Sequence, residues 1–202
     1  MPARGKGFTL IELLVVIGIL IAITLVVLFN YRQFGSTILL ENIAYDIGLS
    51  IRQAQTYGLS VRGVGDGTAT FDTAYGVHFV AADTGHWSFF ADKNRSGVYD
   101  ACAGAGCDTI LEGYTLKRGS TIKRFCATRT NAEEHCTDSS SSPLTTLDIT
   151  FNRPNPDAII TSNVVSGITA FPYQKARITI QTPEGLERHI EIESTGQISV
   201  PQ

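Results

Sequence analysis

Residues 7–12 read Gly7-Phe8-Thr9-Leu10-Ile11-Glu12, and an apolar run continues from there to Phe29. Phe8 to Phe29 is about 22 residues, which as an α-helix would reach about 33 Å, enough to cross the core of a bilayer. Glu12 is the only charged residue in this span, and a lone carboxylate there costs about 2.5–3.5 kcal/mol on insertion scales. A charge kept at such a cost indicates a partner of opposite charge.

A short segment, Met1 to Gly7, precedes the apolar run and carries Arg4 and Lys6 but no apolar core. A secretory signal peptide would have a shorter apolar region, with its cleavage site after that region. A plain membrane anchor would explain the length of the run but neither Gly7 nor Glu12. The arrangement resembles the class III signal of type IV prepilins, in which a short basic leader ends in glycine before Phe, Thr-Leu-Ile-Glu and a hydrophobic stretch.

This resemblance implies that a prepilin peptidase cleaves after Gly7 and methylates the new amine of Phe8. Glu12 would then pair with that amine on a neighbouring subunit during assembly. Arg4 and Lys6 would hold the leader in the cytoplasm by the positive-inside rule. We therefore expect a single-pass protein of the cytoplasmic membrane, with its N-terminus inside and its globular part outside, that later enters an extracellular or periplasmic filament. The implied partners are other pilin or pseudopilin subunits, the prepilin peptidase and an assembly platform in the membrane.

The part of the chain beyond the apolar run is long enough for one globular domain. The formal net charge is −3, and removal of the basic leader would make the chain more acidic, which argues against a broad basic surface for nucleic acid. The four cysteines all lie in the part expected to face outward: Cys102, Cys107, Cys126 and Cys136. An even number outside the cytoplasm indicates two disulfides, with three possible connectivities, of which we favour the local pairs Cys102–Cys107 and Cys126–Cys136. A zinc site with His135 is the alternative, although these spacings differ from the usual Cys-x2-Cys pairs.

The helix is expected to continue beyond the membrane face. Apolar residues recur at spacings of three and four, opposite a polar face that carries Glu41, Asp46, Arg52 and Gln53; the apolar stripe is Leu40, Ile43, Ile47, Ile51 and Ala54. We predict one helix from about Phe8 to about Tyr57, with Gly58 as its stop and Gly35-Ser36 as a point where it could bend. The chain would then comprise a leader (1–7), a membrane or filament-core helix (8–29), an amphipathic continuation (30–58) and a β-rich domain (59–202).

After Gly58 the apolar residues alternate with polar ones. Residues 61–76 are rich in glycine and are predicted to form a loop. Four strand pairs follow: 76–80 with 87–90, 110–117 with 121–125 around Arg118-Gly119-Ser120, 147–151 with 158–161, and 176–181 with 187–193 around Pro183-Glu184-Gly185. A serine-rich loop is expected at 138–143 and a last strand at 197–200. The predicted fold class is α+β, a long helix packed on an antiparallel sheet, which is the type IV pilin-like fold that the resemblance implies.

Parts of this domain are similar to the H-type pseudopilins of type II secretion and to the related FimT-like minor pilins. The similar stretches are residues 42–62, which include Ile51-Arg52-Gln53-Ala54-Gln55, residues 87–97, from Trp87-Ser88-Phe89-Phe90 to Gly97, and Ser194 to Val200. Many type IV pilins carry a proline near the membrane end of the helix, where this chain has Phe29. These features favour a minor pilin or pseudopilin of a type IV pilus or of a type II secretion-like filament. The alternatives are a major pilin and a pilus-associated subunit for DNA uptake or adhesion.

Residues 92–100 match the first part of an EF-hand-like calcium loop. Side chains with oxygen atoms occupy positions one, three, five and nine of the loop, namely Asp92, Asn94, Ser96 and Asp100. Gly97 occupies position six, and Val98 at position seven would offer its backbone carbonyl. The twelfth position holds Ala103 where a bidentate acid is expected, so Glu112 would have to substitute for it. The alternative is a turn in which Asp92 and Asn94 cap their own backbone.

Other chemistry finds less support in the sequence. A modest basic cluster, namely Lys117, Arg118, Lys123, Arg124 and Arg129, could contact DNA, but residues 194–202 hold no Lys or Arg and a solvated strand face is the favoured interpretation. We therefore do not expect DNA as a partner. The four histidines are scattered, and Gly-x-Ser-x-Gly, His-Glu-x-x-His and phosphate-loop motifs are absent. We expect a structural protein that is not an enzyme and needs no cofactor, with calcium as the one ligand to test.

Overall fold

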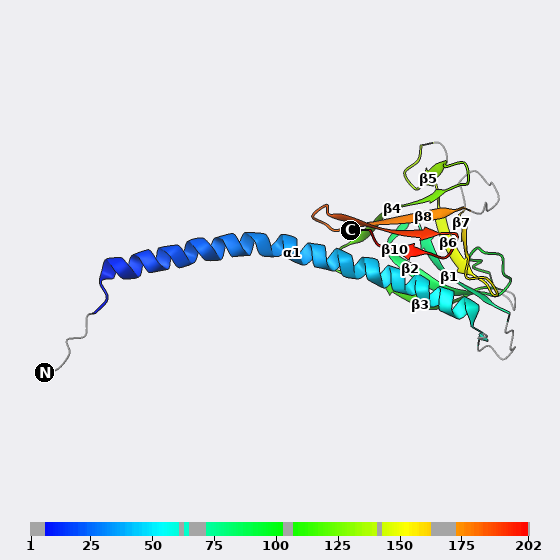
Figure 1. Ribbon diagram of the computed structural model, residues 1–202, viewed down its shortest axis with the longest axis horizontal. Helices are drawn as coiled ribbons and strands as arrows, with labels where there is room; N and C mark the ends of the chain where they lie inside the picture. The colour runs from blue at the N-terminus through cyan, green and yellow to red at the C-terminus, as the bar shows by residue number, and fades with distance from the viewer. Residues whose placement is uncertain are drawn as a thin grey trace. The chain divides into compact units, whose positions relative to one another are not determined.

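The computed structural model describes residues 7–60, 63–64, 72–102, 107–140, 143–162 and 173–201, without the side chains of residues 29–34. Within these residues the chain falls into two compact units, Met1–Leu39 and Leu40–Gln202. A single helix, α1 (Leu10–Leu59), is followed only by strands (Figure 1). The strands are β1 (Ala74–Val80), β2 (Asp83–Asp92), β3 (Thr109–Thr115), β4 (Thr121–Thr128), β5 (Glu134–Cys136), β6 (Thr146–Phe151), β7 (Ala158–Thr161), β8 (Lys175–Gln181), β9 (Glu187–Glu193) and β10 (Ile198–Ser199). This order, one helix and then antiparallel strands, is the α+β class that the sequence predicts.

The first unit contains the N-terminal part of α1. Leu10–Leu28 is long and apolar enough to cross a bilayer, and its large apolar side chains are exposed. The hydroxyl of Thr24 donates to the carbonyl of Leu20 at 2.7 Å, so this polar group is satisfied within the helix. α1 continues as an unbroken helix through Gly35 and Ser36.

In the second unit, the apolar stripe of α1 packs into the core of the domain. All five predicted members of the stripe are buried: Leu40, Ile43, Ile47, Ile51 and Ala54. Their spacing places them on one helix face, and Glu41, Asp46 and Arg52 on the opposite face are exposed. The contact with the strands is also polar, because the Trp87 indole in β2 donates from Nε1 to Ser50 Oγ at 3.0 Å. The predicted amphipathic continuation of the helix is therefore confirmed.

α1 ends at Leu59, within two residues of the predicted end, but Gly58 lies inside the helix and is not its C-cap. A Cβ atom at Gly58 would lie 2.4 Å from the carbonyl oxygen of Phe151 in β6. The glycine therefore allows the helix to approach the backbone of β6 closely, and the helix continues to Leu59. A glycine near the end of a helical pattern can mark a C-cap or a place where the helix backbone closely approaches another backbone. The sequence alone does not distinguish the two.

The strands form two five-stranded antiparallel sheets. In sheet A the order is β3-β2-β1-β6-β7, and in sheet B it is β10-β9-β8-β4-β5. Three predicted pairs are confirmed, namely β1 with β2, β6 with β7 and β8 with β9. β1 begins at Ala74, two residues before the predicted strand at 76–80, and most of the predicted loop at 61–76 lies outside the described residues.

The predicted pairing of the strand at 110–117 with the strand at 121–125 was wrong. β3 pairs with β2 in sheet A, whereas β4 pairs with β8 and β5 in sheet B. The turn at Arg118 and Gly119, both with positive φ, therefore carries the chain from one sheet to the other. A short turn between two strand-like segments predicts a hairpin, but it does not determine which neighbours the strands find in the folded domain.

The core of the second unit is built from the inner faces of both sheets and the stripe of α1. Sheet A contributes mainly large side chains, including Tyr75, Phe79, Phe89, Ile149 and Phe151, and sheet B contributes isoleucines, including Ile178, Ile180, Ile190 and Ile192. Successive residues of a strand point to opposite faces. The alternate residues of β1, β6 and β7 therefore form an outer face of sheet A, on which a buried carboxylate lies.

Candidate functional site

The first candidate site is the N-terminal motif at the start of α1. Phe8 has 79% of its surface exposed, and Glu12 is exposed in the first turn of the helix. Apart from the neighbours of Gly7 in the chain, no described residue has an atom within 4 Å of the position that a Cβ would take there. Gly7, Phe8 and Glu12 are therefore all exposed in the part of the chain that the structure describes.

Sequence reasoning missed a local role of Thr9, at the start of α1. The backbone N–H of Glu12 donates to Thr9 Oγ1 at 3.3 Å, so Thr9 caps the start of α1. Thr at the N-cap with Glu three residues later is the capping-box pattern, and an acid in the first turn also interacts favourably with the helix dipole. The pattern Thr-x-x-Glu in the sequence could have revealed this. Any test of the Glu12 charge must therefore keep the cap that Thr9 supplies.

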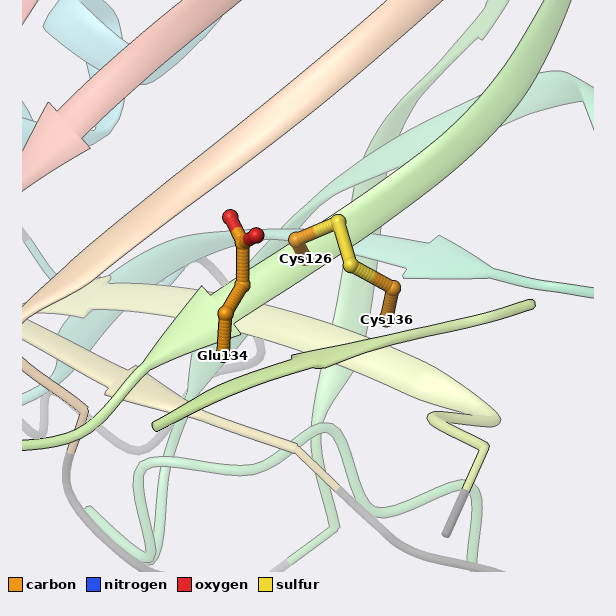
Figure 2. Close-up of side chains that lie close together, drawn as sticks. All are labelled: Cys126, Glu134 and Cys136. Atoms are coloured by element: carbon orange, nitrogen blue, oxygen red, sulfur yellow. A yellow bond between two sulfur atoms is a disulfide. The ribbon is translucent and has the colours of Figure 1, made fainter. Parts of the chain in front are cut away.

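The four cysteines form the two local disulfides favoured from the sequence, Cys102–Cys107 and Cys126–Cys136. Figure 2 shows the second disulfide with Glu134 beside it; the ligand-type atoms of these three residues lie within 4.8 Å of one another. Zinc binds cysteine as thiolate, and these sulfurs are bonded to each other. The alternative of a zinc site at the cysteines is therefore contradicted.

The predicted calcium loop is held by hydrogen bonds to its own backbone. The buried Asp92 accepts from the N–H groups of Ser96 (3.1 Å) and Gly97 (2.8 Å), and Asn94 Oδ1 accepts from Ser96 N–H at 2.9 Å. Ser96 Oγ donates to the Val98 carbonyl at 2.9 Å, and Asn94 Nδ2 donates to Asp100 at 3.0 Å. This is the self-capped turn that the sequence left as the alternative, with Gly97 at a φ of +76°.

An acid that the sequence analysis did not consider completes this loop. The Asp108 carboxylate accepts from Lys93 N–H at 3.0 Å and from Asp100 N–H at 2.8 Å. Ala103 lies outside the described residues, and Glu112 instead accepts a hydrogen bond from the Tyr114 hydroxyl at 2.9 Å in β3. Calcium binding stays a prediction, and isothermal titration of the chain with millimolar calcium tests it.

The outer face of sheet A carries a buried His–Asp pair that sequence reasoning also missed. His78 in β1 and Asp148 in β6 are register partners, and His78 Nδ1 lies 2.6 Å from Asp148 Oδ1. The same oxygen accepts from Tyr99 N–H at 3.3 Å, and the Tyr99 ring lies 4.8 Å from the His78 ring. Asp148 is fully buried, and its Oδ2 has no hydrogen-bond partner among the described residues. This pair therefore fastens residues 92–100 to sheet A.

Burial raises the pKa of Asp148, against the opposing effects of the bond to His78 and of the His78 charge. Burial likewise raises the pKa values of Asp92 and Asp108. A carboxyl group whose pKa is higher in the folded state contributes stability that is fully present below the unfolded pKa and is lost as the pH rises through the folded pKa. These three groups therefore make the domain less stable as the pH rises from about 4 toward neutral.

We expect Asp148→Asn to flatten the dependence of stability on pH. Asparagine cannot ionise. The stability that the wild type loses when Asp148 ionises, between acidic and neutral pH, is therefore not lost in the variant. The measurement is the urea midpoint of the full chain in detergent micelles, followed by the fluorescence of Trp87, at several pH values between 4 and 7.

Asp83→Asn is the matched control for this experiment. Asp83 lies 2.7 Å from His86, but both side chains are about half exposed, and the hydrogen bond from His86 lowers the pKa of Asp83. This variant should keep the wild-type decline of stability toward neutral pH. Equal slopes for Asp148→Asn and the wild type would contradict the assignment of the slope to the buried carboxylate.

The basic cluster is distributed along the turn before β4 and along β4 and its end. Lys123 pairs with Glu187, Arg124 Nη1 lies 3.2 Å from Asp138 Oδ2, and Arg129 Nη1 lies 4.0 Å from Glu133 Oε2. Three of the five cations are therefore offset by carboxylates on the same surface, and a basic patch for a phosphate backbone needs an excess of cations.

Neither a family model nor a curated protein nor a solved structure matches this chain. Its function is therefore inferred from its own residues. Two features are available for that inference: the exposed motif at the start of an apolar helix, and a disulfide-bonded β-rich domain.

Proposed function

We propose that this protein is a structural subunit of a helical filament of the type IV pilus or type II secretion class, assembled through its N-terminal helix as in type IV pilins and pseudopilins. The observation that carries the proposal is the motif Gly7-Phe8-Thr9-Leu10-Ile11-Glu12 at the start of the apolar span Leu10–Leu28. The span is long enough for a membrane anchor, and it holds a single acid near its first residue. A minor pilin or pseudopilin role is proposed ahead of a major pilin role, because Phe29 stands where many pilins carry a proline.

The proposal assigns a role to each residue of the motif. A prepilin peptidase cleaves after Gly7 and methylates the amine of Phe8, and the subunit remains in the cytoplasmic membrane with its β-rich domain outside. Two disulfides in that domain fit an oxidising compartment outside the cytoplasm. During assembly the Glu12 carboxylate pairs with the Phe8 amine of an adjacent subunit, so that both charges leave lipid together.

The proposal requires subunits to meet through unlike surfaces. A filament grows when the contact between copies is head-to-tail and does not close into a ring. The apolar side chains of Leu10–Leu28 then exchange lipid for other helices of the same kind, so little hydrophobic free energy changes on assembly. The specificity of assembly therefore has to come from the charge pair and from the outer domain.

Co-expression with a prepilin peptidase tests the proposed processing. We expect intact-mass measurement to show a chain that starts at Phe8 and carries one added methyl group, because the motif presents Gly7 and Phe8 as an exposed pair. Gly7→Val should block cleavage, since a side chain is introduced at the scissile residue. Gly18→Ala is the matched control, because Gly18 too is exposed but lies in the middle of the span. A mature chain that starts at any other residue would contradict the proposal.

A further inference from the structure

β3 is an unusually open edge of sheet A. Three of the four sheet edges are short or partly covered, since β10 has 2 residues, β5 has 3, and β7 has 4 with a bridge from Ile160 to Tyr173. β3 has 7 residues, and within the described part of the chain no strand pairs with its outer side. β3 has none of the Lys or Pro residues that often protect a long edge. It carries one acid and one bulge, and it exposes Ile110 (48%) and Leu111 (43%).

The backbone of β3 presents hydrogen-bonding groups on this outer side. The N–H of Leu116, just after the strand, donates to the Gly85 carbonyl toward β2 at 2.8 Å. The direction of N–H and C=O groups alternates along an antiparallel strand. Gly113 and Thr115 therefore direct their backbone groups away from β2, where an added strand could pair with them.

A β-bulge turns the middle of β3 toward a pocket. In register with β2, Glu112 pairs with Phe89 and Ile110 pairs with Phe90, so Leu111 is the extra residue. Bulges re-aim side chains, and as a result the neighbours Leu111 and Glu112 both line the same pocket. The pocket has a volume of about 310 Å³ and is also lined by Gln53 and Tyr57 of α1, by Gly63 and Val64, and by Tyr75 and Phe89 of sheet A.

The described lining of the pocket combines aromatic rings with the carboxylate of Glu112. Tyr57 makes edge-to-face contacts with Tyr75 (5.6 Å between ring centroids) and with Phe89 (5.4 Å). Among the described residues that line the pocket, Glu112 is the one with a charge, and its side chain is exposed. Aromatic rings attract cations through their faces, and a carboxylate adds a charge-assisted hydrogen bond. This chemistry fits the side chain of a lysine or arginine.

We propose that β3 and this pocket form a docking site for an extended segment of a different protein, which adds to sheet A as a strand and inserts a lysine or arginine side chain beside Glu112. In this mode of recognition the backbone of the edge strand supplies affinity and a side-chain pocket supplies specificity. The inference goes beyond the proposed filament function, because it concerns a contact of the outer domain that does not involve the N-terminal helix.

Selection from a phage-displayed library of random nonapeptides tests the proposal. The bait is the full chain in detergent micelles, with the Gly113→Pro variant for counter-selection, because proline lacks the backbone N–H that the added strand needs. We expect enrichment of sequences with β-branched residues on both sides of one Lys or Arg. The chain has one tryptophan, Trp87, which stacks on Tyr114 of β3 with ring centroids 5.0 Å apart, so its fluorescence reports binding of the selected peptide.

Two further changes separate the pocket from the edge. Glu112→Gln should lower the affinity for the selected peptide about tenfold. The same substitution should not change the affinity for a control peptide in which Gln replaces the Lys or Arg. Backbone N-methylation of alternate peptide residues should abolish binding, which tests the strand pairing without any change in the protein. Glu193→Gln, an exposed acid of β9, is the control and should not alter the affinity.

Several results would overturn the proposal. One is the absence of peptides enriched over the Gly113→Pro bait; another is enrichment of peptides without Lys or Arg. If Glu112→Gln did not change the affinity for the selected peptide, the pocket would not be part of the binding site. If a peptide of residues 109–115 bound as tightly as the selected ones, the edge would pair copies of this chain and the assignment to a different protein would be wrong. None of these results bears on the cleavage after Gly7, so the two proposals fail separately.

Discussion

Glu12→Gln is expected to remove this protein from filaments while leaving the start of α1 intact. Glutamine keeps the hydrogen-bonding shape of the capping box but has no charge to pair with the Phe8 amine of a neighbour. The loss of one partner of a buried ion pair costs about 3–5 kcal/mol, which is a factor of about 100 to several thousand in association. The measurement is the amount of this protein in sheared surface filaments relative to the membrane fraction, determined by quantitative mass spectrometry.

Two controls separate charge from capping in this experiment. Thr9→Ala removes the Oγ1 acceptor of the Glu12 N–H, which costs about 1 kcal/mol of helix stability, but it keeps the charge and should preserve assembly. Glu41→Gln removes an exposed acid from the same helix outside the apolar span and should also preserve assembly. Filaments that contain Glu12→Gln at the wild-type level would refute the proposed ion pair, and failure of Thr9→Ala alone would show that assembly depends on the cap and not on the charge.

Gly58→Ala and Gly48→Ala are expected to change the stability of the domain in opposite directions. A Cβ at Gly58 would lie 2.4 Å from the Phe151 carbonyl oxygen, and forced overpacking of this kind costs about 1–3 kcal/mol. A Cβ at Gly48 would meet only Ile198 Cγ2, at 3.9 Å. There the higher helix propensity of alanine should stabilise the domain by up to about 1 kcal/mol.

The pair is informative because the two substitutions are identical and lie in one helix. Urea unfolding of the full chain in detergent micelles, followed by Trp87 fluorescence, measures both free energies of unfolding, since Trp87 is buried and bonded to Ser50 of α1. If both variants were more stable than the wild type, helix propensity would dominate at both sites and the close approach of α1 to β6 would be wrong.

The elements of this fold that depend on local pattern could be predicted from the sequence. The stripe from Leu40 to Ala54 has the helical period, and the hairpin of β8 and β9 has both alternation and a Pro183-Glu184-Gly185 turn. In these cases the residues that determine the structure are neighbours in the chain. The local disulfide pairs belong to the same class, because their cysteines are 5 and 10 residues apart.

The features that could not be predicted depend on residues far apart in the chain. The separation of β3 and β4 into different sheets is set by their contacts with β2 and β8. The need for glycine at position 58 comes from Phe151, and the buried pair of His78 and Asp148 joins strands 70 residues apart. The alternation in β1 and β6 predicts which residues share a face, but not which residues of the two strands stand opposite each other.

The two sheets interleave along the chain, since sheet A needs β6 and β7 and sheet B begins with β4. The chain leaves a ribosome or a translocation channel from its N-terminus, so β4 and β5 emerge before sheet A is complete. Sheet A is complete only after β7 has emerged, and sheet B only after β10, at Ile198. The pairings of β1 with β6 and of β4 with β8 join distant parts of the chain, whereas those of β1 with β2 and of β8 with β9 are local. Because the segments of the two sheets alternate along the chain, a protease cut at residues 116–120 would separate β1 from β6 and would not release a folded half.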